Sequence, residues 1–266
     1  MAVAVSDYRE FPPPRALAEY FVCFWTQTIH SPVGFAQRVL PDCCVDILLL
    51  NDAPIVVGPW TESYVAPLPP RTKILGARCH PGFAPSLLGM PASELLNCIA
   101  PLSDVWGSEK TARFARLADE LALPARISAM ETALLRYLAD SSPVDKATSA
   151  AIRWISRHPH GRVEQLSQWL GLSSRQIQRR FTIAVGYGPK LFQSVLRFQR
   201  LLHVASNSSA QTKLVDLSAE AGYSDQAHMT REVQRFSGIP PSVSLQSPRC
   251  TLRLSGLIQS PDSLDS

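Results

Sequence analysis

The stretch LSAEAGYSDQAHMTREVQRFSGIPPS spans residues 217–242 of the 266-residue chain. It repeats a pattern that begins fifty-one residues earlier, in LSQWLGLSSRQIQRRFTIAVGYGP at residues 166–189. In both stretches a short amphipathic segment ends at a glycine, Gly171 or Gly222, and a polar residue able to cap a helix follows. Glycine permits a tight turn, and Ser or Asp accepts hydrogen bonds from the first N–H groups of a helix. The repeat therefore predicts two helix-turn-helix units.

Each turn is followed by a second helix with an apolar inner face. The inner residues are Ile177, Phe181 and Ala184 in the first unit, and Met229, Val233 and Phe236 in the second. The offset from Ile177 to Met229 is fifty-two, so the second turn is one residue longer. Stop signals follow both helices at Gly186 with Pro189, and at Gly238 with Pro240 and Pro241.

The outer faces of these second helices carry side chains suited to reading bases. Arg175, Gln178 and Arg179 project together, because positions i, i+3 and i+4 share one side of a helix. Arg can pair with guanine and Gln with adenine in the major groove, and small apolar groups can contact a thymine methyl. The predicted base-reading residues are Arg175, Gln176, Gln178, Arg179, Gln226, Ala227, His228, Thr230 and Arg231.

Residues 191–204 keep helical periodicity between the two units and predict a helix that fixes one unit relative to the other. Recognition helices on one side of a duplex would then enter major-groove segments about one helical turn apart, on the order of ten base pairs. The predicted phosphate contacts are Ser174, Arg180, Lys190, Arg197, Arg200 and Arg235. On this interpretation Arg179→Ala or Arg231→Ala lowers specificity, whereas Arg197→Ala weakens all sequences alike.

Charge is distributed unevenly along the chain. Residues 1–145 hold 11 Lys and Arg against 15 Asp and Glu, and residues 146–266 hold 15 against 7, so the halves carry −4 and +8. Because phosphate neutralisation supplies most nonspecific affinity for nucleic acid, the basic half is the one expected to meet double-stranded DNA. The alternative is a plain helical bundle with solvated Arg and Gln side chains. The duplication and the stop signals favour DNA binding.

The N-terminal half has a different pattern. Short apolar runs separated by Pro and Gly-Pro turns predict strands over residues 45–50, 55–57, 64–68 and 74–77. Strands this close together leave no room for crossover helices, so a β-sandwich or small barrel is expected, and such a domain can enclose a ligand cavity.

Two amphipathic helices are predicted after Ala92. Their apolar faces comprise Phe114, Leu117 and Leu121, then Ile127, Met130, Leu134 and Leu138. The second helix either packs on its own sheet or pairs with its copy in a homodimer. Residues 140–143 have the composition of a linker. The predicted fold is α+β: a β-sandwich domain with flanking helices over residues 1–140, an all-α DNA-binding domain over residues 146–246, and a disordered tail over residues 247–266.

Six cysteines are present, namely Cys23, Cys43, Cys44, Cys79, Cys98 and Cys250. None forms a C-x-x-C pair, and buried thiols in a reducing compartment usually behave as small apolar groups. Cys79-His80 together with Cys43-Cys44 is the alternative, as a metal or thiol sensor. The sequence predicts no catalytic residue, metal or cofactor. It has no run of eighteen apolar residues and no signal-peptide pattern, so a cytoplasmic protein without membrane contact is expected.

The segments AGYSDQAHMTR (residues 221–231) and RFSGIPPS (residues 235–242) resemble the AraC/XylS family of bacterial transcriptional regulators. The likeness covers residues 148–245 and departs at Val233, where the family usually has Phe. It implies a seven-helix DNA-binding domain with two helix-turn-helix units. RNA polymerase and a second copy of the chain are further candidate partners.

The segments RVLPDCCVD (residues 38–46) and RCHPG (residues 78–82), with Gly58-Pro59, look like the cupin-like sensor domain that precedes this module in one subgroup. That subgroup tends to have Gly at the position of Cys43. The resemblance implies a pocket for a small-molecule effector, although it identifies no ligand-binding residue. The His-x-His pattern of enzymatic cupins does not occur in residues 1–140, which argues against a metalloenzyme.

Three functions are therefore open at this point. The first is a DNA-binding transcriptional regulator that responds to a small molecule or another signal. The second is a thiol- or metal-dependent sensor or repair enzyme that a DNA-binding module delivers to DNA. In the third, the N-terminal domain is a dimerisation scaffold without a ligand.

Overall fold

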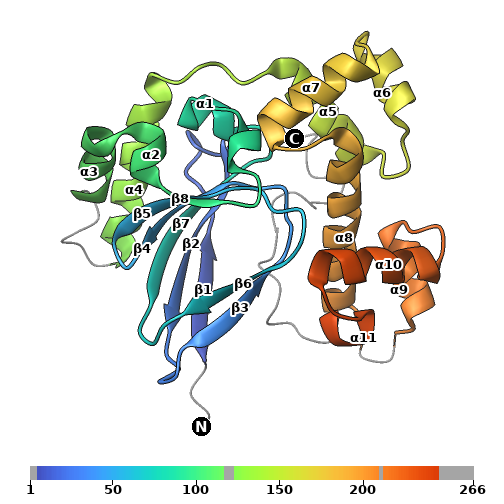
Figure 1. Cartoon of the computed structure of the whole chain (residues 1–266), viewed down its shortest axis with the longest axis horizontal. Coiled ribbons are helices and arrows are strands. Elements are labelled where there is room, and N and C mark those ends of the chain that lie inside the picture. Colours follow the sequence, from blue (N-terminus) through green and yellow to red (C-terminus); the bar gives the residue numbers. More distant parts are fainter. Residues whose placement is uncertain (1–4, 117–122, 210–211, 246–266) are drawn as a thin grey trace.

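The computed structural model describes residues 5–116, 123–209 and 212–245. A β-rich half precedes a helical half, so the fold is α+β as predicted (Figure 1). The strands are β1 (Ser6–Phe11), β2 (Phe21–Ile29), β3 (Phe35–Val39), β4 (Asp46–Leu50), β5 (Ala53–Val57), β6 (Tyr64–Leu68), β7 (Lys73–Cys79) and β8 (Ile99–Pro101).

The helices of the β-rich half are α1 (Ala84–Leu88), the 3-10 turn η1 (Ala92–Leu95), α2 (Leu102–Trp106), α3 (Ser108–Arg116) and α4 (Leu123–Ala139). Those of the helical half are α5 (Lys146–Arg157), α6 (Val163–Leu170), α7 (Ser174–Val185), α8 (Pro189–Asn207), α9 (Leu214–Ala221), α10 (Gln226–Ser237) and α11 (Pro241–Ser244). No helix among the described residues is long and apolar enough to span a bilayer.

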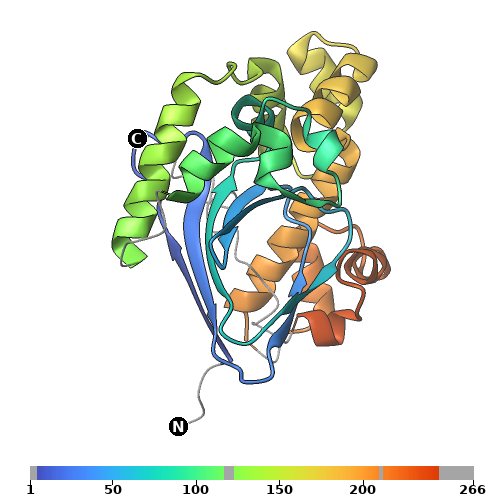
Figure 2. The same ribbon diagram turned by 60° about the vertical axis from the view of Figure 1, so that its left-hand side comes forward.

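The main sheet has the antiparallel order β1-β2-β7-β4-β5-β8. Successive residues of a strand point to opposite faces, and β4 shows this alternation. Ile47 and Leu49 face the helices, whereas Leu48 faces the other way. Helix α4 covers the first face with Met130 and Leu134, so it packs on its own sheet (Figure 2).

A two-stranded ribbon of β3 and β6 covers the opposite face of the main sheet. Phe35 and Leu68 of the ribbon share one apolar cluster with Trp25 and Leu48 of the sheet. The indole of Trp25 lies against Gly76, where a Cβ atom would stand 2.4 Å from the ring. Trp25 therefore fills the space between the two layers at this point.

The predicted strands correspond to β4, β5, β6 and β7, and the bounds of residues 64–68 agree with β6. Strands β1, β2, β3 and β8 were not predicted from the sequence. Strand β2 is buried along both faces, so its residues lack the polar-apolar alternation that indicates a strand. Phe114 lies in α3, whereas Leu117, Leu121 and the expected tail at residues 247–266 lie outside the described residues.

The helical half has its own core, organised around α8. Phe192, Val195, Phe198 and Leu201 on this helix are fully buried among the helices of both repeats. The predicted linker helix over residues 191–204 is thus confirmed and extends to Pro189–Asn207. It runs between the two helix-turn-helix units in Figure 1.

A charged cluster lies inside the β-rich half. The Arg78 guanidinium is fully buried, and its Nε lies 3.3 Å from Asp46 and 3.5 Å from Asp42. Asp46 also accepts a 2.8 Å hydrogen bond from the Trp25 indole. Burial raises the pKa of Asp42 to about 6, the charge of Asp46 adds to the effect, and Arg78 opposes it.

Four of the cysteines are buried, as expected for thiols that act as small apolar groups: Cys23, Cys43, Cys44 and Cys79. Burial raises the pKa of the Cys23 thiol to about 12 and raises the pKa values of the other three as well. A thiol held in this form is a poor nucleophile, so these positions do not favour thiol chemistry. Cys98 is partly exposed, and Cys250 lies outside the described residues.

The backbone explains why a glycine would suit the position of Cys43. Its φ angle is +67°, in the left-handed region that residues other than glycine adopt only at a cost. Cys43 nevertheless packs into the core of the helical half, beside Tyr187. The Asp42-Cys43 segment therefore joins the buried charge cluster to the helical half.

The raised pKa of Asp42 predicts a specific pH dependence of stability. The folded state holds this proton more tightly than the unfolded chain, so the stabilisation is fully present below about pH 4 and is lost as the pH rises through about 6. Asp42→Asn mimics the protonated carboxyl. The difference in unfolding free energy, variant minus wild type, should therefore increase between pH 4.5 and pH 7 in urea titrations. Exposed Asp104→Asn provides the background, and a flat or decreasing difference would contradict the assignment.

Candidate nucleic-acid interface

The first helix-turn-helix unit consists of α6, a short turn and α7. Gly171 ends α6 with a φ angle of +64°, which a residue with a Cβ atom rarely adopts. Ser173 then caps α7 by accepting from the Gln176 N–H, and the Gln176 carboxamide accepts from the Ser173 N–H at 2.8 Å. This reciprocal capping box satisfies two N–H groups that a helix start leaves without partners.

The second unit consists of α9, a longer turn and α10. Gly222 ends α9 with a φ angle of +87°, and Asp225 caps α10 by accepting from the His228 N–H at 2.6 Å. Two residues separate Gly222 from its cap, against one between Gly171 and Ser173, so the predicted difference in turn length is confirmed. The stops at Gly186 and Gly238 are also confirmed, because both glycines end their helices in left-handed conformations.

The predicted base-reading residues occupy the first two turns of each recognition helix, α7 or α10. Most are exposed, namely Arg175, Gln176, Gln178, Arg179, Gln226, Ala227, Thr230 and Arg231. Arg175 and Arg179 of α7 have no hydrogen bond or ion pair within the described residues, and the same holds for Arg231 of α10. Their guanidinium groups are therefore available to a ligand outside the protein.

Four of these candidates already have partners inside the protein. Gln176 belongs to the capping box, and the amide of Gln178 lies against Gly188 at the start of α8. The Thr230 hydroxyl donates to the backbone of Gln226 at 2.8 Å, which leaves its methyl group free for an apolar contact. His228 is half-buried, and its ring lies 3.6 Å from Glu232.

The predicted phosphate contacts divide into two groups. Ser174, Lys190 and Arg235 are exposed. Arg180 pairs with Asp145 at 2.7 Å, next to the start of α5. Half-buried Arg200 donates weakly to the Ser156 carbonyl at 3.4 Å, and burial lowers its pKa.

Arg197 belongs to a cluster that joins α8 to α10. Its guanidinium makes two hydrogen bonds to Glu232, at 2.8 and 3.2 Å, and lies over the Tyr223 ring. Both side chains are largely buried, with 13% and 12% of their surface exposed. The second recognition helix is thus tied to the linker helix by a bidentate ion pair.

The β-rich half contacts the same point of both repeats, the C-terminal end of each recognition helix. At Gly186 after α7, a Cβ atom would come within 2.8 Å of Pro59 and 3.3 Å of the Ala92 carbonyl. At the end of α10, the Ser237 carbonyl accepts hydrogen bonds from Arg38 at 2.9 Å and from Ser63 at 3.0 Å. Both contacts leave the N-terminal turns of α7 and α10 uncovered.

Further residues that position the site were not identified from the sequence. Gln193 on α8 donates to the carbonyls of Pro159 at 3.0 Å and Gly161 at 2.9 Å, which holds the loop before α6. Glu232, Arg38 and Ser63 are polar residues in otherwise ordinary surroundings. Each finds a partner far away in the chain, and no local pattern indicates such a contact.

The two halves match separate protein families. Residues 9–101 match a family described as a domain of unknown function (DUF6597), and residues 166–247 match one described as a helix-turn-helix domain. No curated protein matches the chain.

The solved structures to which the chain is similar include ToxT from Vibrio cholerae. An apo point variant of ToxT is 10% identical with a TM-score of 0.45, over 86% of this chain and 98% of that one. A 1.65 Å structure of ToxT is 9% identical with a TM-score of 0.42, over 91% and 97% of the two chains. The AraC-like transcriptional activator CuxR is 14% identical with a TM-score of 0.23, over 75% and 86%.

The C-terminal half thus has both the sequence signature and the duplicated geometry of one kind of DNA-binding protein. Its match to the helix-turn-helix family begins in α6 and covers both recognition helices. Residues 166–247 therefore belong to the helix-turn-helix family of that match, and a β-rich domain precedes them in the chain.

Proposed function

We propose that the protein reads two successive major-groove segments of one operator, with α7 in the first and α10 in the second. The observation that carries this proposal is the placement of two exposed recognition faces on a single buried helix, α8. A shared rigid support fixes the distance between the two helices, so both can act on the same face of a duplex.

The first base contacts in this proposal fall to side-chain groups without internal partners. In the first segment Arg175 and Arg179 pair with guanines. In the second, Arg231 and Gln226 make the polar contacts, and Ala227 with the Thr230 methyl contacts thymine. Gln176, Gln178 and His228 also reach bases in this proposal, although each must first leave an internal partner.

Phosphate contacts fall first to Ser174, Lys190 and Arg235, which are exposed. Arg180 and Arg200 are partly exposed and serve as further phosphate contacts in this proposal. Arg197 has a different part in the proposal: it holds α10 in place through Glu232, so its effect on DNA binding is indirect.

The β-rich half completes the proposal as the domain that receives a small-molecule or other signal. Its contacts at Gly186 and Ser237 give it access to both recognition helices. We assign the protein to the cytoplasm, because a bacterial chromosome lies there. RNA polymerase and a second copy of the chain are the further partners in this proposal.

Selection of duplexes from a random library, at two salt concentrations, tests the proposed function. Enriched DNA should contain two blocks about one helical turn apart, and affinity should decrease with salt in proportion to the phosphates contacted. A single block, or enrichment that is independent of sequence, would contradict two-segment readout.

Substitutions separate base reading from phosphate binding. Arg179→Ala and Arg231→Ala should each reduce discrimination by about 1–3 kcal/mol, and each should relax specificity in a different block. Lys190→Ala removes an exposed charge instead, so it should weaken specific and random DNA equally and lower the salt slope by about one. Titrations on the selected site and on a scrambled site measure both effects. Equal losses on both sites for all three variants would refute the division.

Arg197 should behave as a structural residue rather than as a phosphate ligand. Arg197→Met leaves Glu232 buried without its partner, which costs about 3–5 kcal/mol of unfolding free energy. The loss of DNA affinity should therefore persist at low salt, unlike that of Lys190→Ala. Chemical denaturation and low-salt binding measure the two quantities. A variant of normal stability that binds all DNA weakly would instead make Arg197 a phosphate contact.

A further inference from the structure

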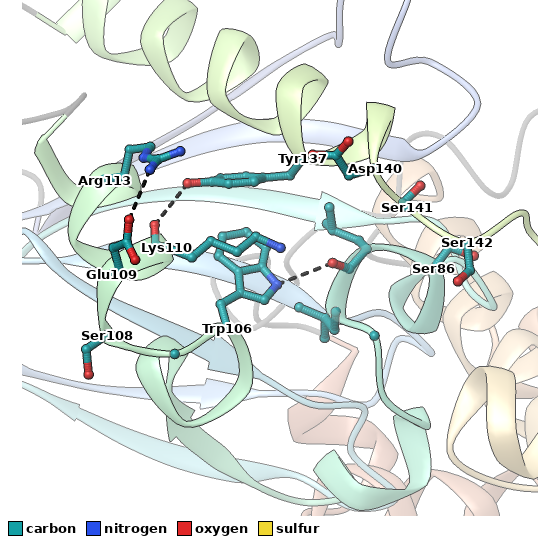
Figure 3. Close-up of a pocket in the computed structure, with 14 residues that line it drawn as sticks. Ser86, Trp106, Ser108, Glu109, Lys110, Arg113, Tyr137, Asp140, Ser141 and Ser142 are labelled. Atoms are coloured by element: carbon teal, nitrogen blue, oxygen red, sulfur yellow. Dashed lines mark hydrogen bonds and ion pairs between the residues drawn. The ribbon is translucent and has the colours of Figure 1, made fainter.

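A cavity of about 570 Å³ lies on the helix-covered side of the β-rich half (Figure 3). Three parts of the chain line it: the end of α1 from Ser86, the junction of α2 and α3 from Trp106 to Lys110, and the end of α4 with the linker after it, from Tyr137 to Ser142. Small-molecule sites commonly have volumes of roughly 300–1,000 Å³. The cavity is therefore large enough for a ligand of that class.

Two aromatic rings form one wall of this cavity. The centroids of Trp106 and Tyr137 lie 4.6 Å apart. The Trp106 indole donates to the Leu87 carbonyl at 3.3 Å, and the Tyr137 hydroxyl donates to the Lys110 carbonyl at 2.9 Å. These hydrogen bonds hold the rings in place, so they offer a prepared surface to a flat apolar group.

Four charged side chains line the cavity, and only two of them pair with each other. Arg113 and Glu109 form an ion pair at 3.2 Å. Lys110 and Asp140 make no side-chain hydrogen bond or ion pair within the described residues. The Lys110 ammonium instead lies 4.6 Å from the Trp106 centroid and 4.7 Å from that of Tyr137. Burial lowers its pKa, and the charge of Asp140 opposes that effect.

We propose that this cavity binds a small zwitterion of the amino-acid type with an aromatic side chain. The ligand's carboxylate pairs with Lys110, its ammonium group pairs with Asp140, and its ring lies on Trp106 and Tyr137 in place of the lysine arm. The lining charges cancel, which favours a zwitterion over a free acid or a free amine. The displaced cation–π contact is weak at a partly exposed site, so the exchange is favourable.

This site is an effector site if the proposed function is correct, because the cavity wall leads to the first recognition helix by two routes. Helix α1, which forms one wall, contacts α7. Ser142, in the linker, is three residues before Asp145, which caps α5 and pairs with Arg180 on α7. A ligand that moves either wall therefore acts on α7.

Binding is tested first on the full chain without DNA, by calorimetry. The probes are L-phenylalanine, 3-phenylpropionate, which lacks the ammonium group, and phenethylamine, which lacks the carboxylate. L-phenylalanine should bind with 1:1 stoichiometry and at least about tenfold tighter than either analogue. Absence of binding, or equal affinity for all three probes, would overturn the proposal.

Variants then locate the site. Lys110→Met should lower the affinity for L-phenylalanine to the affinity that the wild type has for phenethylamine. Asp140→Asn should lower it to the affinity that the wild type has for 3-phenylpropionate. Lys73→Met removes an exposed lysine on β7 outside this cavity and should change nothing. Unchanged binding in both cavity variants would overturn the site.

The effector role is measured separately, as the change in operator affinity caused by saturating L-phenylalanine. A change that Lys110→Met abolishes supports the role. Binding of the amino acid without any change in operator affinity would overturn the effector role. The assignment of the binding site would then remain. Absence of operator binding with or without the amino acid would count against the proposed function instead.

Discussion

The DNA-binding half depends on one constraint, the packing of both helix-turn-helix units on the same helix. Helix α8 has 19 residues and is therefore about 28 Å long, close to the roughly 34 Å rise of one turn of B-DNA. Its inner face is buried by both repeats, and Arg197 fixes α10 to it through Glu232. The two recognition helices are consequently held at one defined separation. A DNA site that both helices read must place its two segments at the same separation.

The β-rich half adds a second set of contacts at corresponding positions of the repeat. Each recognition helix ends at a contact with the β-rich half. This contact lies at Gly186 after α7, and at Ser237 and Gly238 at the end of α10. The segment from Arg38 to Cys43 is central to this arrangement. Arg38 reaches α10, the Pro41 carbonyl accepts from Gln199 on α8, and Cys43 packs beside Tyr187 after α7. A change in this segment would reach both recognition helices together, which suits a domain that controls both.

The sequence was sufficient to predict the parts of the molecule that local chemistry determines. Glycine turns, capping residues and 3.6-residue periodicity predicted α6 to α10, because each signal lies within a few residues of its effect. Strand β2 was missed because its burial on both faces removes the alternation that indicates a strand. The pairs Arg197–Glu232 and Arg38–Ser237 were missed because only the tertiary fold brings their members together. Arg197 therefore looked like a solvent-facing phosphate ligand in the sequence, although the fold gives it an internal partner.

The most direct test of a fixed separation is the affinity for a selected two-block operator after insertion of base pairs between the blocks. Five added base pairs rotate the second block to the opposite face, and ten return it to the same face about one turn further away. The rigid arrangement on α8 predicts that both insertions reduce affinity to that of a single block. Recovery of affinity at ten base pairs, or no loss at five, would contradict the account, because the two units would then move independently.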